Sequence, residues 1–333
     1  MKERDKSIDF LRATAILFMT ITHVNSLFYL GKSPILDIFT ALGATVCFSV
    51  FLFASAYVTG IKIKNNSTIK IESTLKRILE IYIVYIILGI LITFVIRSEI
   101  ATKQITDIVL LRSIPEFTEF LIAFIVFTIF TQLFFKQLKY FLSKPILLIL
   151  LGITVYVVGV VIYNLTTNNT YPDTVRILLE HTVGYGNLHR FPLTYYFPIF
   201  VFGLLLSKYS NIKTLLIITI ISLVSLLILR ITGISGWYRW PPSVAFLLYG
   251  FVYIPLVILI YNKFTKLFST KIFTLFSNMG KYALEQLFLS TFLIFASLLF
   301  LNPSQSPITS ILMNIIVISA LLLHPIVFHP KMV

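Results

Sequence analysis

Long runs of apolar residues dominate the sequence and constrain the fold more than any other feature. Of the 333 residues, 58% are hydrophobic and only 12% are charged, whereas about 25% of residues in an average soluble domain are charged. A helix that crosses the bilayer needs roughly 20 mostly apolar residues. The runs therefore predict an all-α bundle of about ten transmembrane helices, with the expected ranges 8–30, 36–60, 78–97, 117–135, 145–163, 192–207, 212–231, 243–262, 278–301 and 308–328.

No soluble domain interrupts these runs, so residues 1–333 are predicted to form a single integral membrane domain. The longest segment between expected helices is 164–191. The charged start is followed by a long apolar run that contains Arg12 and His23, which favours a retained first helix over a cleaved signal peptide. The only cysteine, Cys47, lies inside an apolar run, which excludes a disulfide framework and a cysteine metal cluster.

The distribution of Lys and Arg predicts the orientation of the chain. With the N-terminus inside, the inner segments hold seventeen Lys and Arg residues and the outer segments hold seven. This asymmetry follows the positive-inside rule and an even number of spans places both termini in the cytoplasm. The formal charge of +14 is then explained by cytoplasmic loops, and we expect the lipid bilayer, not nucleic acid, as the partner of this basic chain.

The first expected helix carries two polar side chains that need an explanation. Arg12 and His23 are eleven positions apart, which is close to three helical turns, so both lie on one face about 16 Å apart along the axis. In one interpretation Arg12 extends to the inner surface and His23 bonds a neighbouring carbonyl. In the other, both face a protein interior or a wet cavity. Arg12 is also placed to contact Asp9, three positions earlier on the same face.

Three motifs resemble one known family. The membrane acyltransferase 3 family typically has an Arg on the first helix that is followed, after ten residues, by a His. Arg12 and His23 have this spacing. The run Val50-Phe-Leu-Phe-Ala-Ser-Ala56 is similar to the family's Phe-Phe-x-x-Ser-Gly, and the run Leu75-Lys-Arg-Ile-Leu-Glu-Ile-Tyr82 is similar to its Arg-Arg-Ile-x-Arg-Ile-x-Pro-x-Tyr. The chain looks most like the subgroup of poly-N-acetylglucosamine O-succinyltransferases.

Several positions depart from the family pattern. Ala56 replaces the usual Gly, Glu80 and Lys76 stand where the family has Arg, and Ser290 stands where it often has His. Glu119 precedes Phe-Leu where many members have Trp. These departures leave the acyl group and the acceptor open.

The resemblance implies an acyl transfer across the plasma membrane of a bacterium. An acyl-CoA donor would bind at the inner face, with Arg12, Lys76 and Arg77 suited to its phosphates. His23 would deprotonate a hydroxyl of an extracellular polysaccharide or glycan, which would receive an acetyl or succinyl group. Neither a permanently bound cofactor nor a metal ion is expected.

Other polar residues are candidates for the acceptor site or for a cavity. These are Glu116, Glu119, Arg176, His181, Trp237, Trp240 and Glu285. The two tryptophans fit an interfacial aromatic belt or a surface on which a sugar stacks. Glu285 is expected deep in the ninth helix, where a carboxylate needs a partner. Two other functions stay open: a transporter or flippase for a lipid-linked or polymeric sugar, and a non-catalytic membrane partner of a glycan synthase.

Overall fold

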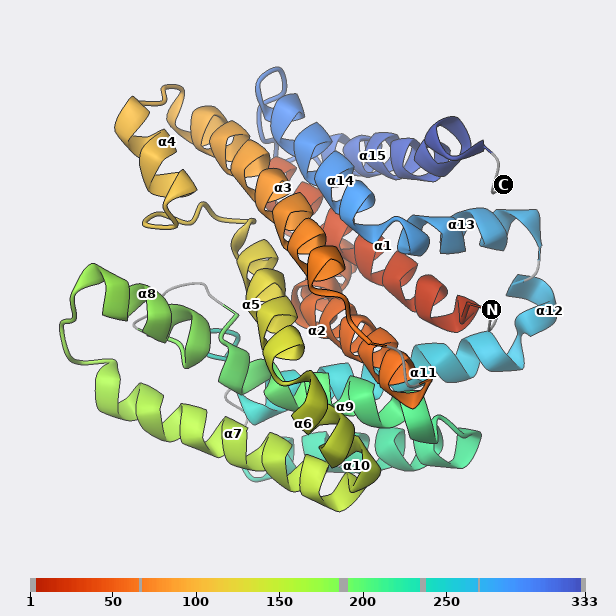
Figure 1. The fold of residues 1–333 in the computed structure, drawn as a ribbon. Helices are drawn as coiled ribbons and strands as arrows, with labels where there is room; N and C mark the ends of the chain where they lie inside the picture. Colours follow the sequence, from red (N-terminus) through yellow and green to blue (C-terminus); the bar gives the residue numbers. More distant parts are fainter. Residues whose placement is uncertain (1–3, 66–67, 186–190, 234–237, 269, 331–333) are drawn as a thin grey trace. The chain divides into compact units, whose positions relative to one another are not determined.

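The computed structural model describes residues 4–65, 68–185, 191–233, 238–268 and 270–330, and every named element among them is a helix (Figure 1). The helices are α1 (Lys6–Phe28), α2 (Pro34–Lys64), α3 (Ile71–Arg97), α4 (Thr102–Val109), α5 (Glu119–Leu133), α6 (Phe135–Ser143), α7 (Pro145–Thr166), α8 (Asp173–Thr182), α9 (Leu193–Tyr209), α10 (Ile212–Ile231), α11 (Val244–Lys263), α12 (Thr265–Phe268), α13 (Lys271–Lys281), α14 (Ala283–Leu298) and α15 (Pro307–Phe328).

An apolar helix occupies each of the ten ranges expected from the sequence. Among the described residues, seven helices are long and apolar enough to cross a membrane, or up to eight if the pair α5 and α6, bent by 75°, is one span. Two shorter apolar helices, α9 and α14, fill the remaining ranges. The all-α fold of a multi-pass membrane protein is therefore confirmed, while length alone supports seven or eight spans and the number ten stays a prediction.

The contacts divide the chain into two compact units. One unit contains Met1–Phe51, Leu215–Ser222 and Tyr249–Val333. The other contains Leu52–Thr214 and Leu223–Leu248. Each unit is described below by itself.

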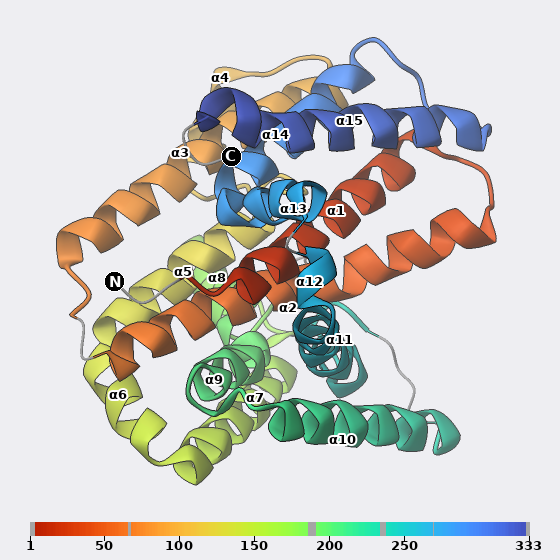
Figure 2. The ribbon, with the colours of Figure 1, turned by 90° about the vertical axis from the view of Figure 1, so that its right-hand side faces the viewer.

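In the first unit, α1 is the most enclosed helix. Leu11, Ala13, Ala15 and Ile16, which point in different directions around its axis, are all fully buried. The helix packs against α13, α14 and α15, and α14 and α15 lie alongside each other (Figure 2). Because neighbours surround α1, several of its polar side chains are buried within the protein, among them Asp9, Thr20 and Asn25.

Two glycines allow neighbouring segments to approach α1 closely. A Cβ on Gly280 of α13 would lie 1.8 Å from the backbone oxygen of Asp9, and a Cβ on Gly43 of α2 would lie 2.2 Å from the backbone oxygen of Phe18. Neither distance is possible for a real side chain. Small residues at such crossings are typical of membrane helices, whose association depends on close packing.

The end of α1 is fixed by a buried polar network around Asn25. The side-chain oxygen of Asn25 accepts hydrogen bonds from the Ser310 hydroxyl at 2.6 Å and from the Asn314 amide at 3.0 Å, both on α15. The Asn25 amide donates to the Thr40 hydroxyl of α2 at 3.0 Å. Beyond the helix, the Leu30 amide donates to the backbone oxygen of Ser304 at 2.9 Å.

In the second unit, α3 packs against α5, and α7 packs against α9. The contact between α5 and α9 is aromatic: Phe127 stacks on Phe200 with ring centroids 5.5 Å apart, and Phe130 meets Phe197 edge to face at 5.4 Å. By contrast, one side of α7 carries exposed Ile146, Ile149 and Ile153. Apolar side chains left uncovered in this way suit contact with lipid.

The orientation can be tested with two introduced cysteines. Thr170 lies in the predicted outer segment and Thr68 in a predicted inner one, and both side chains are exposed. Thr170→Cys should react with a membrane-impermeant maleimide on intact cells, and Thr68→Cys should react only after permeabilisation. The parent protein serves as the control, since its own Cys47 is buried. Reaction of both variants on intact cells would overturn the predicted topology.

Candidate active site

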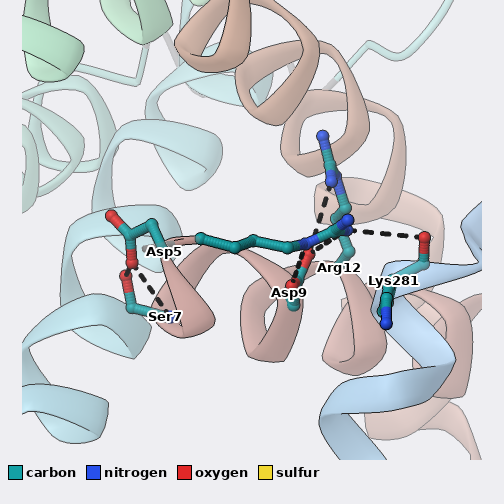
Figure 3. A network of polar contacts seen from close by, with 6 residues as sticks. Asp5, Ser7, Asp9, Arg12 and Lys281 are labelled. Carbon is teal, nitrogen blue, oxygen red and sulfur yellow. Dashed lines mark hydrogen bonds and ion pairs between the residues drawn. The ribbon is translucent and has the colours of Figure 1, made fainter. Parts of the chain in front are cut away.

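The Asp9 carboxylate is the centre of an ionic cluster at the start of α1 (Figure 3). Arg4 donates to it with two nitrogens, from Nε to Oδ2 at 2.5 Å and from Nη2 to Oδ1 at 2.7 Å. Arg12 also approaches this carboxylate, with its Nη1 atom 3.5 Å from Oδ1. The contact between Arg12 and Asp9 that the helical spacing predicts is therefore present, and Arg4 is an additional partner that the sequence did not indicate.

The local backbone explains why these groups meet. Asp5 precedes α1 and its carboxylate accepts hydrogen bonds from the backbone amide and the hydroxyl of Ser7, at 3.0 Å and 2.6 Å. This cap begins the helix, so Asp9 falls in the first turn and Arg12 one turn later. Arg4 lies before the cap and folds back over Asp9, while its Nη2 atom also donates to the backbone oxygen of Lys281 at 3.5 Å.

The side chains of the two arginines differ in how far they are buried. The Arg4 side chain is about half exposed, whereas the Arg12 side chain is 18% exposed and the Asp9 carboxylate is buried. The hydrogen bond to Asp9 raises the pKa of Arg4, so this guanidinium stays charged. Two positive charges thus stand against one negative charge, and the cluster carries an excess positive charge that suits an anion.

His23 lies on the same face of α1, three turns beyond Arg12. Its side chain is partly buried. The neighbouring residues Thr22 and Asn25 form hydrogen bonds to α2, and the Thr22 hydroxyl donates to the backbone oxygen of Thr40 at 3.1 Å. The helix is thus held in position on either side of His23. Arg12 and His23 are brought onto one buried helix face, as the sequence predicts, and their catalytic roles stay predictions.

Lys76 and Arg77 belong to the second unit, whereas Arg12 and His23 belong to the first. Arg77 lies on α3, its side chain is 51% exposed, and its Nη1 atom is 3.5 Å from Glu80 one turn later. Lys76 is also exposed. The shared donor site of these residues therefore stays a prediction.

The prediction that Glu285 lies deep in one ninth helix is wrong. The chain breaks at Tyr282, between α13 and α14, so Glu285 falls in the first turn of α14 with its side chain 50% exposed. Its Oε2 atom is 2.9 Å from Nε2 of His329 and 3.5 Å from Nε2 of His324. The carboxylate therefore meets two histidines near the C-terminus, a contact that needs the tertiary fold. Its role in a cavity stays a prediction.

The remaining candidates lie in the second unit. Arg176 is 3.1 Å from Asp173 and 3.5 Å from Glu180, both on α8, and Glu180 and the neighbouring His181 are buried. Glu119, the first residue of α5, is buried, whereas Glu116 is exposed.

An aromatic and cationic cluster also lies in this unit. The Trp240 ring packs edge to face against Phe191, with centroids 4.7 Å apart, and the Arg239 guanidinium lies 4.6 Å from the Trp240 ring centroid. Trp237 lies outside the described residues. Sequence analysis missed Arg239, although its position between two aromatic residues was a signal. In the described part of the chain, no group of three or more His, Cys, Asp or Glu side chains could hold a metal ion.

Comparisons with known proteins give one match. A family model described as an acyltransferase domain matches residues 5–329. No curated protein and no solved structure matches the chain. The match includes Asp9, Arg12, His23 and the other candidate residues that the sequence predicts, whereas Arg4 lies just before it.

If the Asp9 cluster stabilises the fold, removing the charge of Asp9 should lower the stability of the protein. Asp9→Asn keeps the shape of the side chain but removes the charge that two guanidiniums share. Losing hydrogen bonds to a charged, buried partner should lower the free energy of unfolding by about 1.5–3 kcal/mol. Arg4→Gln should cost less than about 1 kcal/mol, because the Arg4 side chain is half exposed. Thermal denaturation of the purified protein in detergent measures both.

Asp37→Asn provides the matched control, since Asp37 is also in the first turn of a helix but is exposed. If Asp9→Asn unfolds at the same temperature as Asp37→Asn, the cluster does not stabilise the fold.

Proposed function

The chain belongs to the membrane acyltransferase 3 family, whose model matches residues 5–329, and on this premise we propose how it acts. It transfers an acetyl or succinyl group from an acyl-CoA-type thioester to a hydroxyl of a polysaccharide or glycan outside the membrane. The observation that carries this proposal is that Arg12 and His23 share one face of α1, the most enclosed helix of its unit, and that Arg12 contacts the buried Asp9. Family membership favours the enzyme over a transporter or flippase.

Arg12 has the properties needed to bind the donor. A guanidinium is planar, permanently charged and able to form paired hydrogen bonds with phosphate oxygens. Asp9 orients it, and Arg4 bonds both oxygens of that carboxylate. Because the cluster has two positive charges and one negative charge, a phosphate of the donor would balance it. Lys76 and Arg77 are the further cations that we propose for the donor.

His23 has the properties needed to activate the acceptor. An imidazole titrates near neutral pH in water, so it can accept a proton at physiological pH and release it afterwards. In the proposed reaction, His23 removes the proton from the acceptor hydroxyl as the oxygen attacks the carbonyl carbon of the thioester. The carbon–sulfur bond then breaks, and the proton passes to the leaving thiolate. Glu119, Arg176, His181 and Trp240 are proposed to contact the acceptor.

The proposal is tested first at His23. The variant His23→Gln keeps a polar side chain of similar length but cannot take up the proton. A general base contributes a factor of roughly 10² to 10⁴, so the acyl content of the surface polysaccharide should fall to the level of a deletion strain. Ester content is measured after mild alkaline release, and immunoblotting of membranes confirms equal amounts of protein. A well-expressed variant that acylates at the parental rate would exclude His23 as the base.

The donor site is tested at Arg12. The variant Arg12→Lys keeps the charge but loses the planar fork, so affinity for acyl-CoA in detergent should fall by about 1.5–3 kcal/mol, a factor of ten or more. The matched control is Arg230→Lys, because Arg230 is an exposed residue at the end of α10. Equal donor affinity in the two variants would show that Arg12 serves the structure alone.

A further inference from the structure

Two buried threonines among the described residues depart from the pattern that the others follow. Of the nine among the described residues, seven donate their hydroxyl to a backbone oxygen; these are Thr22, Thr45, Thr59, Thr74, Thr118, Thr131 and Thr219. In most of them the acceptor is a carbonyl one turn earlier in the chain. A threonine inside a helix commonly satisfies its hydroxyl in this way.

Thr20 does not follow this pattern. Its side chain is 0% exposed, yet its Oγ1 atom has no hydrogen-bond partner among the residues that the structure describes. Thr291 on α14 and Ser49 on α2 are the other buried hydroxyls of this kind. A buried donor without an acceptor destabilises the folded protein, so a hydroxyl retained there calls for a reason beyond packing.

The position of Thr20 supplies that reason. It is on α1, three residues before His23, and residues at this spacing are neighbours on a helix surface, with Cβ atoms about 5–6 Å apart. Thr20 lies about 80° around the helix axis from Arg12 and about 60° from His23, so its hydroxyl is at the edge of the face that carries them. Among the three unpartnered hydroxyls, only Thr20 shares a helix with His23.

We propose that the Thr20 hydroxyl is a catalytic hydrogen-bond donor to the carbonyl oxygen of the acyl thioester. This inference rests on the proposed function. When the acceptor oxygen forms its bond to the carbonyl carbon, the electron pair of the carbon–oxygen double bond moves to the carbonyl oxygen, and His23 holds the acceptor's proton. The Thr20 hydroxyl stabilises this oxyanion. The double bond then re-forms, the carbon–sulfur bond breaks, and the thiolate takes the proton from His23, which leaves an ester and a free thiol.

This role explains why the hydroxyl has no partner within the protein. A donor that already bonded a backbone carbonyl would have to break that bond as negative charge develops on the substrate. A donor fixed on a buried helix and left unbonded is instead ready for the transition state, and preorganised donors of this kind contribute more in a dry site than in water. The missing hydrogen bond of this hydroxyl raises the energy of the resting protein. The hydroxyl forms a hydrogen bond to the substrate during the reaction.

The test compares a nearly isosteric change with a conservative one. Thr20→Val removes the hydroxyl and keeps the branched shape, so we expect kcat for acyl transfer to fall by roughly 10²–10³. Thr20→Ser retains a hydroxyl and should keep activity within about tenfold of the parent. Donor affinity of Thr20→Val, measured with acyl-CoA in detergent, should match that of the parent, because the bond strengthens only as the oxyanion forms.

Stability separates this role from a structural one. Since Thr20 has no hydrogen-bond partner to lose, Thr20→Val should unfold at the same temperature as the parent or higher. The matched control is Thr45→Val, because the Thr45 hydroxyl donates to the backbone oxygen of Ala41 at 2.6 Å; this variant should retain kcat. A folded Thr20→Val protein with the parental kcat would overturn the inference, and so would an equal loss of kcat in Thr45→Val.

Failure of this inference is distinguishable from failure of the proposed function. If His23→Gln abolishes transfer while Thr20→Val leaves kcat unchanged, the protein is the proposed acyltransferase and Thr20 is not its oxyanion donor. If neither variant alters transfer, the proposed mechanism at α1 is wrong as a whole.

Discussion

A charged group inside a membrane protein must be paired within the protein, because the bilayer provides no water to solvate it. Asp9 is under this constraint most strongly, since its carboxylate is buried while two guanidiniums contact it. Much of the first unit follows from this pairing. Arg4 folds back over the start of α1, Arg12 turns toward Asp9, and α13 lies close enough for the Lys281 carbonyl to accept a hydrogen bond from Arg4.

The sequence predicted the fold class and the helix positions well, because both depend on local properties. An apolar run of sufficient length is a helix in a bilayer whatever its neighbours are, and each of the ten expected ranges contains an apolar helix. The errors arose where tertiary packing shapes the chain. The break at Tyr282 lies in a continuous stretch without proline that was expected to form one helix over 278–301, so hydropathy gave no sign of it.

The candidate site shows the same division. Arg12, His23 and the contact of Arg12 with Asp9 were predictable, since the helical repeat alone places them on one face. Arg4, the Asn25 network and the isolated hydroxyl of Thr20 were not, because each depends on which backbone oxygens and side chains from distant helices lie nearby. The prediction for Glu285 failed for this reason, because its partners are His324 and His329, about 40 residues away in the chain.

The attachments of α1 have a consequence for the order of assembly. Near its start the helix is linked through Arg4 to the backbone of Lys281, and near its end Asn25 is bonded to Ser310 and Asn314. Both links join the first helix to segments from the last part of the chain, so they can form only after residues up to Asn314 have been synthesised.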